Sequence, residues 1–287
     1  MIEPSLTATT PPGLPGWGPR VGLLTHFSRT FCKETHPMPP QTIDDVLIEL
    51  DQIILRARNE RSRLGFFPTL YRNVTIKVKE GIAAGAFEDG ARMEKLDVTF
   101  ANGYLAALDA FRNGKPLRKC WLVSFQMAAK WPPIILQHLL TGMNAHINFD
   151  LGIAAQAVAP GAELASLEHD FNQINAILGA MVAKVRSDVE EVSPWINFLD
   201  RIAPSAENQF INFSLDKARA SAWLVANIVN STPTEQLPRK LSILDNGVAI
   251  LGSLIGSPKE WLVSLGLHVI RLRETSDIPH IIDVLSQ

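Results

Sequence analysis

Several features that identify familiar classes of protein are scarce in this sequence of 287 residues. It has two cysteines, Cys32 and Cys120, which are too few for a disulfide-stapled secreted scaffold or a cysteine-rich zinc site. It has no excess of either charge, since 27 Lys and Arg residues stand against 29 Asp and Glu residues. A protein whose main partner is nucleic acid needs a basic surface, so we expect no nucleic-acid partner.

The sequence also lacks a long apolar run. The best candidate for a membrane span, Val248–Ile255, is far shorter than the ~20 residues that a bilayer requires. Residues 1–24 lack a basic start, and four prolines interrupt the apolar stretch that an export signal needs. We therefore expect no transmembrane segment and a cytoplasmic protein.

The short motifs of common catalytic and cofactor sites are absent too. We find no G-x-x-x-x-G-K-[ST] loop, no G-x-G-x-x-G after a strand, and no G-x-S-x-G, H-E-x-x-H or C-x-x-C. The paired E-x-x-H motifs of a carboxylate-bridged di-iron bundle are also missing. No serine or cysteine nucleophile can be assigned from a sequence signature.

Glycine and proline divide the chain into two parts. Twelve of the Gly and Pro residues lie in the first 40 positions, where no hydrophobic periodicity is visible. We therefore predict an N-terminal arm over residues 1–40 and a helical domain over residues 41–287.

From Thr42 onward, apolar residues recur at helical spacing, and no alternating pattern predicts a sheet. Thr42 and Asp45 have the spacing of an N-cap pair. We predict an all-α fold, a single bundle of about eight to ten helices around a central buried helix. The predicted helices begin at Thr42 and Pro68 and then cover about 89–113, 119–131, 133–159, 170–192, 195–202, 214–230, 235–255 and 259–274, with a short tail from Ile278.

The segment Ile134–Ala159 is the best candidate for the central helix, because its apolar residues occupy every side. At roughly 100° per residue, three of its polar side chains lie at about 0°, 80° and 120° around the axis and two amides at about 240° and 280°. The ionisable group is His138, His146 and Asp150, and the amide group is Asn144 and Asn148. Burying such groups without partners costs about 1–3 kcal/mol each.

His146 and Asp150 are four residues apart and therefore lie on one face of a helix. They are candidates for a ligand or metal site, because perturbed buried groups cluster at functional sites. The alternative is a His–Asp pair that only cross-links helices, with Asn144 and Asn148 binding backbone groups of neighbouring helices.

Two further carboxylates fall on apolar helix faces. Asp97 precedes Phe100 and Tyr104 on one stripe, so its side chain is expected to point inward. Asp170, with Gln173 three residues later, has the spacing of a helix N-cap, which is the alternative to a role in a site. Arg219 is expected to point inward and to neutralise one of these acids, an arrangement that is more common as a structural ion pair.

The run Leu136–Gly152, LQHLLTGMNAHINFDLG, resembles the signature LLxGxNAHINxDL of a bacterial and fungal family of all-helical proteins of unknown function. The stretches LDVTFANGYLAAL, from Leu96, and DFNQINAIL, from Asp170, resemble the helices before and after that signature. The resemblance would extend over roughly residues 42–275 and implies a fold and a candidate pocket, but no established reaction.

These patterns favour an enzyme that acts on a small, largely apolar molecule inside the bundle. His146 would serve as general acid or base, oriented by Asp150, with Asp97 and Tyr104 facing them from another helix. Hydrolase, lyase and cyclase chemistry are all compatible with these residue types. The substrate-binding candidates are the remaining polar side chains, His138, Asn144, Asn148, Asp170 and Arg219.

Other interpretations stay open at this stage. A metal-assisted enzyme would bind zinc or iron through His146, Asp150 and Asp97, with His138 or Asp170 completing the ligand set. A non-catalytic protein would use the same polar groups to orient a lipid or another hydrophobic molecule. A structural protein would satisfy all of them internally and contain no pocket.

Overall fold

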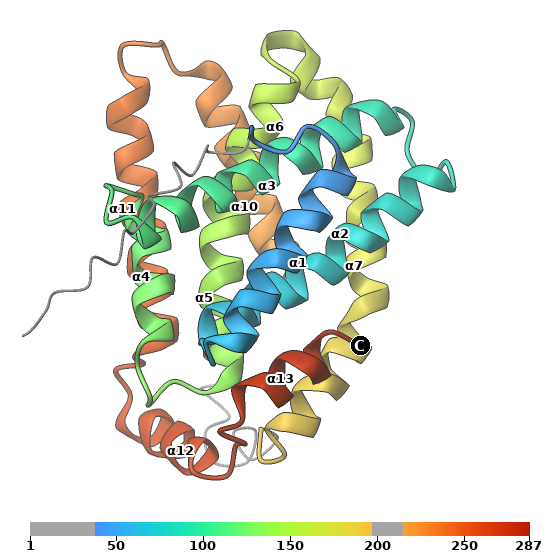
Figure 1. The fold of residues 1–287 in the computed structure, drawn as a ribbon. Helices are drawn as coiled ribbons and strands as arrows, with labels where there is room; N and C mark the ends of the chain where they lie inside the picture. The colour runs from blue at the N-terminus through green and yellow to red at the C-terminus, as the bar shows by residue number, and fades with distance from the viewer. Residues whose placement is uncertain (1–37, 197–214) are drawn as a thin grey trace, which may run out of the picture. The chain divides into compact units, whose positions relative to one another are not determined.

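Every regular element in the described part of the chain is a helix (Figure 1). The computed structural model describes residues 38–196 and 215–287, and no β-strand occurs within these ranges. The predicted all-α bundle is therefore confirmed. Most of the predicted N-terminal arm and of the predicted helix at 195–202 lies outside the described residues, so both stay predictions.

Most of the observed helices begin and end near the predicted positions. They are α1 (Ile43–Asn59), α2 (Phe66–Ala83), α3 (Gly90–Arg112), α4 (Lys119–Ala128), α5 (Ile135–Ala145), the π-helical η2 (His146–Leu151), α6 (Gly152–Val158), α7 (Leu164–Val192), α10 (Leu215–Ser231), α11 (Leu237–Gly256), α12 (Trp261–Arg271) and α13 (Ile278–Leu285), with short 3₁₀ turns η1 (Arg63–Gly65) and η3 (Gly161–Glu163).

Helix α1 starts at the predicted capping pair. The Thr42 hydroxyl accepts the Asp45 backbone N–H at 3.1 Å, and the Asp45 carboxylate accepts the Thr42 backbone N–H at 3.0 Å. These two bonds satisfy donors that the first turn of a helix leaves unpaired.

Helix α7 starts six residues earlier than predicted, at Leu164, so Asp170 is not its N-cap. The turn η3 after Pro160 leads directly into the helix, and Leu164 and Leu167 extend its buried stripe in the N-terminal direction. The prediction was wrong because the spacing of Asp170 and Gln173 also fits a helix interior, where a buried acid can bind another segment.

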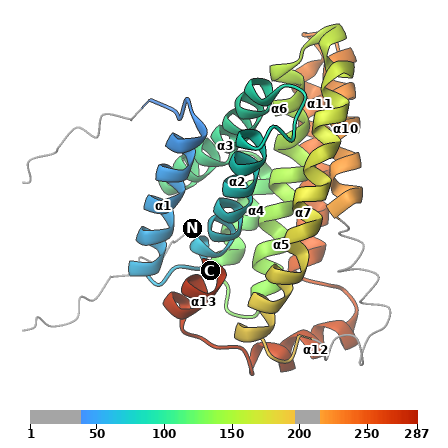
Figure 2. The ribbon, with the colours of Figure 1, turned by 90° about the vertical axis from the view of Figure 1, so that its right-hand side faces the viewer.

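The central helix runs through the middle of the bundle as α5, η2 and α6 (Figures 1 and 2). It contacts α2, α3, α4, α10 and α11. Two glycines allow close approach: a Cβ on Gly142 would lie 2.6 Å from the Phe67 ring, and one on Gly152 would lie 2.7 Å from Val225 Cβ. The central helix can therefore be buried on several sides, as its apolar sequence predicts.

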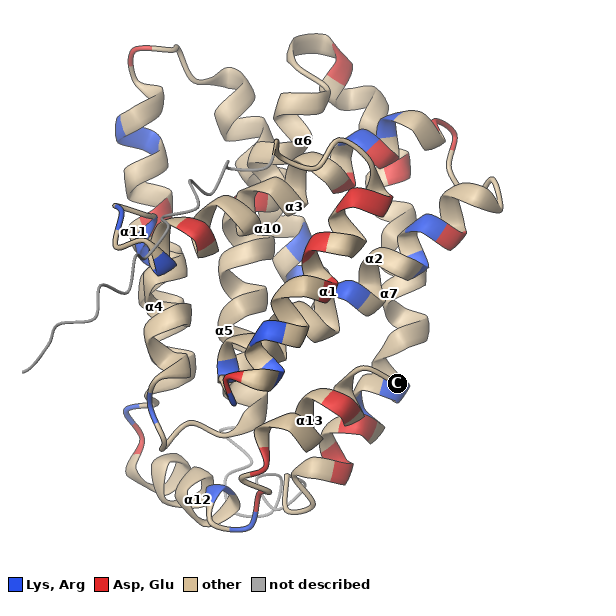
Figure 3. Cartoon of the chain, in the orientation of Figure 1, with Lys and Arg blue, Asp and Glu red and all other residues tan. Residues whose placement is uncertain are grey.

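Charged residues are concentrated on the outer helices and the connecting loops (Figure 3). Between residues 135 and 158, Asp150 is the only Asp, Glu, Lys or Arg residue. The charge of the central helix thus comes from a single carboxylate.

Residues Pro39–Gln287 form one compact unit. Within the described residues, no single helix is long and apolar enough to cross a membrane, and only α11 and α12 together, bent by 64° at their junction, meet the length and composition criteria.

Candidate functional site

The winding of the central helix changes at the polar run that begins with His146. Residues His146–Leu151 form the π-helical segment η2, and five of the six side chains in it are buried. A π-helical turn contains more residues than an α-helical turn, and such segments occur frequently at functional sites. The angles predicted with a constant α-helical period therefore do not hold beyond His146.

His146 lies in an aromatic environment and is 2% exposed. Its imidazole stacks on the Phe100 ring with centroids 3.5 Å apart, and the Tyr71 ring meets it edge-on at 4.5 Å. Neither ring nitrogen has a hydrogen-bond partner. Burial lowers the pKa of His146, and the nearby Asp150 opposes this shift only in part, so the imidazole is neutral near neutral pH.

Asp150 lies beside His146 but is bonded to another residue. Its Oδ2 accepts the Trp121 Nε1–H at 2.8 Å and is 3.7 Å from His146 Nδ1, which is too long for a hydrogen bond. Gly103 makes room for this carboxylate, since a Cβ there would lie 3.2 Å from Asp150 Cγ. The predicted neighbours are thus brought together, with Trp121 as an additional partner.

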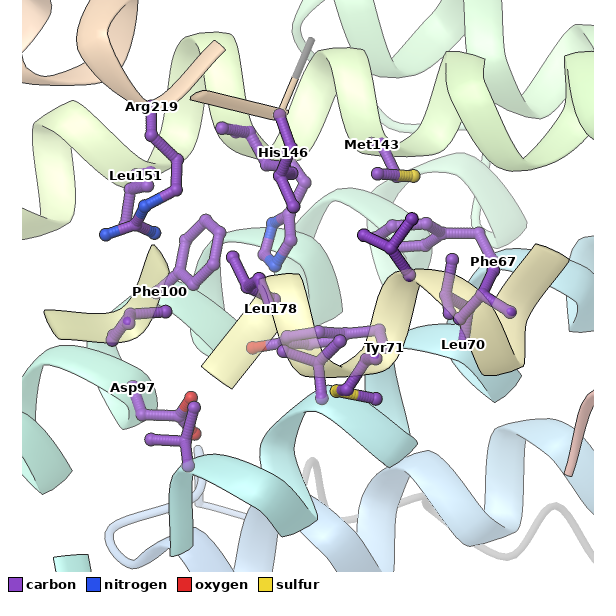
Figure 4. A pocket seen from close by; sticks show the side chains of 18 of the residues that line it. Phe67, Leu70, Tyr71, Asp97, Phe100, Met143, His146, Leu151, Leu178 and Arg219 are labelled. Carbon is purple, nitrogen blue, oxygen red and sulfur yellow. The ribbon is translucent and has the colours of Figure 1, made fainter. Parts of the chain in front are cut away.

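A cavity of about 450 Å³ lies on the other side of His146, bounded by α2, α3, the central helix, α7 and α10 (Figure 4). Its wall is mostly apolar: Phe67, Leu70, Met143, Leu151 and Leu178 are among the lining residues. The volume lies in the range of about 300–1,000 Å³ that is typical of sites for small molecules. This geometry removes the interpretation that the bundle contains no pocket.

Five polar side chains interrupt this apolar wall: Tyr71, Asp97, His146, Arg186 and Arg219. Asp97 is 7% exposed, and its Oδ2 has no hydrogen-bond partner. Burial and the nearby Glu94 carboxylate raise the pKa of Asp97 to about 7. The Tyr71 hydroxyl is also without a partner, and burial together with Asp97 raises the pKa of this phenol well above its usual value.

Arg219 reaches the wall from α10. Its guanidinium donates to the Phe171 carbonyl oxygen and lies 4.4 Å above the centroid of the Phe171 ring. The inward orientation predicted for Arg219 is therefore observed, but its described hydrogen bond is to a backbone carbonyl rather than to one of the predicted acids.

Several of the predicted site residues lie away from the cavity wall. Tyr104 is packed behind it, between the rings of Phe67 and Trp121, with centroids 5.2 Å from each. His138 meets the Phe66 ring edge-on at 5.8 Å, and burial, with added repulsion from Arg63 and Arg271, lowers its pKa to about 3.

The two amides bond to each other and to α11. Asn148 Nδ2 donates to Asn144 Oδ1 at 3.1 Å, and Asn144 Nδ2 donates to the Val248 carbonyl at 2.9 Å. Neither residue lines the cavity. The predicted role of these amides in substrate binding is therefore not supported. The alternative, that they bind backbone groups of neighbouring helices, agrees with the bond from Asn144 to Val248.

Asp170 also turns away from the cavity. Its fully buried carboxylate accepts the backbone N–H groups of Glu88 and Asp89 at 2.7 and 3.0 Å. Burial alone would raise the pKa of Asp170, but these bonds and Arg92 lower it below its usual value. Asp170 therefore holds the backbone that precedes α3, and it does not line the cavity.

The predicted metal ligands are not brought together. In the part of the chain that the structure describes, one group of His, Cys, Asp and Glu residues has ligand atoms all within 4.8 Å, and it is Glu88, His169 and Asp170. His146, Asp150 and Asp97 do not form such a group, because Asp97 lies on α3 across the cavity wall and Asp150 turns toward Trp121. Glu88 and His169 are exposed, and the Asp170 oxygens already accept two backbone donors.

Most of the cavity wall carries no signal in the sequence that marks it as part of a site. Tyr71 and Phe67 on α2 were not identified, although they surround His146. Helix α7 contributes a long apolar stripe to the wall, including Ile174, Leu178 and Met181. This stripe is visible in the sequence, but periodicity alone does not distinguish a stripe that fills a core from one that borders a cavity.

Comparison with known proteins supplies a family but no activity. No curated protein and no solved structure matches the chain significantly. The family described as "Family of unknown function (DUF5995)" matches residues 43–258, which include the central helix and every residue that lines the cavity. Since the match extends over most of the sequence, the chain belongs to this family of unknown function.

Proposed function

We propose that this protein binds a small, largely apolar molecule in the cavity beside His146. The observation that carries the proposal is the cavity itself, about 450 Å³ with a wall that is apolar except at a few positions. A site of this kind obtains affinity from buried apolar area and orientation from its few polar groups. Those polar groups are Tyr71, Asp97, His146, Arg186 and Arg219.

Binding can be tested with N-phenyl-1-naphthylamine, an uncharged dye whose fluorescence rises in apolar surroundings. The folded protein should enhance its fluorescence with a saturable dependence on concentration. Leu178→Trp, which places a large side chain at the cavity wall, should abolish the enhancement. Leu224→Trp is the matched control, because Leu224 is 64% exposed on α10 and does not line the cavity. A folded wild-type protein without saturable enhancement would refute the proposal.

A second candidate is acid–base catalysis on the bound molecule, and the environment of His146 favours it. The imidazole is neutral, lines the cavity and has no hydrogen bond at either nitrogen, so it is able to accept a proton from a bound molecule. Asp150, held by Trp121, lies beside Nδ1 and would stabilise the imidazolium that forms. If His146 accepts this proton, the protein is an enzyme. If it does not, the protein binds its ligand without catalysis.

The two candidates can be separated by trapping a substrate. His146→Gln should retain the molecule it captures during expression, and mass spectrometry of an organic extract would identify that molecule. Wild-type protein added to the extract should convert it to a product of different mass or retention time. Asp150→Asn should convert it more slowly. An extract that wild-type protein leaves unchanged would favour binding without catalysis.

A further inference from the structure

The buried carboxylates of the described chain differ in whether the protein supplies a hydrogen-bond donor for them. Four are buried to more than nine-tenths: Asp97, Asp170, Asp245 and Glu274. Three of them accept hydrogen bonds from the protein: Asp170 from the backbone of Glu88 and Asp89, Asp245 from the backbone of Lys119 and Cys120, and Glu274 from Ser193, Ile135 and Arg271. Asp97 is the exception.

Asp97 has no ion pair with any described residue, and its Oδ2 has no hydrogen bond. The charged group that acts on it is the Glu94 carboxylate, one turn earlier on α3, which has the same sign. An unpaired buried carboxyl group destabilises a fold, because the interior solvates its charge poorly. Among the described residues, the one buried carboxylate that lines the cavity is therefore left without a partner.

The neighbouring polar groups do not supply a positive charge. The Tyr71 hydroxyl points toward the side of the cavity on which Asp97 lies, as Figure 4 shows, and it is neutral. His146 lines the same wall and is neutral because it is buried. Tyr71 and His146 can accept or donate hydrogen bonds, but within residues 38–196 and 215–287 no group supplies a positive charge that pairs with Asp97.

We infer that the molecule bound in this cavity carries a basic nitrogen, and that its ammonium group pairs with the Asp97 carboxylate while its apolar part fills the cavity. This inference rests on the binding function proposed above. An ammonium group offers several N–H donors, and a charge-assisted bond to a buried carboxylate is stronger than a neutral one. An alcohol would provide a neutral hydrogen bond only, and a fatty acid would place like charges together at Asp97.

Two cations on the cavity wall, Arg186 and Arg219, would favour the opposite ligand. The protein itself provides partners for both: Arg186 Nε donates to Glu190 Oε1 at 2.9 Å, and the Arg219 guanidinium is engaged by the carbonyl and the ring of Phe171. The contrast between these partnered cations and an unpartnered Asp97 is the reason for preferring a cationic ligand over an anionic one.

Three ligands with the same alkyl chain test the inference: decylamine, decan-1-ol and decanoate, each measured by displacement of N-phenyl-1-naphthylamine at neutral pH. Wild-type protein should bind decylamine about tenfold more tightly than decan-1-ol, the difference expected of a charge-assisted bond, and should bind decanoate most weakly. In Asp97→Asn the affinities for decylamine and decan-1-ol should lie within about twofold of each other, because the substitution keeps the shape of the side chain and removes its charge.

Glu94→Gln is the matched control, because it removes an acidic charge from the same helix at a position that does not line the cavity. It should leave the preference for the amine intact. If Asp97→Asn does not fold, as judged by circular dichroism, the three ligands on the wild-type protein decide the matter alone.

Each outcome has a distinct meaning. Equal affinity for amine and alcohol, or tighter binding of decanoate, would overturn the inference and leave the proposed binding function standing. Loss of the amine preference in Glu94→Gln as well as in Asp97→Asn would overturn the assignment to Asp97. A wild-type protein that binds neither the dye nor any of the three ligands would refute the binding function itself.

Discussion

Asn144 links two helices through one buried side chain. It is fully buried, donates to the Val248 carbonyl on α11 and accepts from Asn148 within the central helix. A buried polar group that loses its partner lowers the free energy of unfolding by about 1–3 kcal/mol. Breaking one of these bonds therefore changes stability by more than a formed hydrogen bond usually contributes.

Asn144→Ala should therefore lower the free energy of unfolding by about 1–3 kcal/mol, because it removes the bond to the Val248 carbonyl and takes away the acceptor of the Asn148 amide. Urea unfolding followed by circular dichroism provides the measurement. Asn227→Ala is the control, since Asn227 is exposed and bonds only within its own helix, and it should change stability by less than about 0.5 kcal/mol. Equal effects for the two variants would contradict a structural role for Asn144.

Asp97 makes the stability of the free protein depend on pH. Its pKa in the folded chain is raised to about 7 from the usual value of 3.8. Between these two values the folded chain binds the proton and the unfolded chain does not, so the free energy of unfolding falls as pH rises through this window.

Asp97→Asn should be more stable than wild type at about pH 8, by a few kcal/mol, and nearly equal to it at about pH 3, where the Asp97 carboxyl group is protonated in both the folded and the unfolded chain. Thermal melting across this range checks the prediction. The groups that face Asp97 or act on it, Glu94, Tyr71 and His146, are present in both proteins, so the difference isolates Asp97. A difference that does not grow with pH would show that Asp97 ionises normally in the folded chain.

At the scale of elements, α6 and α10 pack with little space between their backbones. A Cβ on Gly152 would contact the Ala222 carbonyl oxygen and lie 2.7 Å from Val225 Cβ. A backbone carbonyl cannot move without shifting α10, which also carries Arg219 on the cavity wall.

Gly152→Ala should therefore destabilise the protein by about 1–3 kcal/mol, the usual effect of overpacking. Gly247→Ala is a matched control within α11, where a Cβ would meet nothing within 4 Å. It should be neutral or raise stability by about 0.5–1 kcal/mol, because alanine favours a helix interior over glycine. Denaturant unfolding of both variants decides, and a neutral Gly152→Ala would mean that α10 moves away at little cost.

At the scale of the whole molecule, the two ends of the chain are expected to contribute differently to folding. Residues 1–38 have no periodic apolar face. Helix α13, although it lies beyond the region matched by the family, buries Ile281, Ile282, Val284 and Leu285 against α1, α2 and α7.

A chain that starts at Pro39 should consequently unfold cooperatively, with a transition as sharp as that of the full chain. A chain that ends at Asp277 should lose several kcal/mol of stability, since it exposes the apolar surfaces that α13 covers. Circular dichroism during urea unfolding distinguishes these outcomes. Loss of cooperativity on removing residues 1–38 would show that this segment is part of the folded core.

Local signals in the sequence determine the helices of this protein. The capping pair at Thr42 and Asp45 starts α1 as predicted, and the run from Ile134 is apolar on every side because it forms the buried centre of the bundle. Whether a segment forms a helix, and which of its faces is buried, depends on the spacing of apolar residues within that segment. The sequence alone contains this information.

Only the tertiary structure decided what the polar side chains bind. His146 and Asp97 line the same cavity because α3 packs beside the central helix. The Asp150 carboxylate instead binds Trp121. The Asp170 carboxylate binds the backbone just before α3, and the Asn144 amide binds α11. The spacing of a residue shows that its side chain points inward, but its partner lies on another helix. That partner is set by which helices pack together, and for Asp97 the helices that the structure describes provide none.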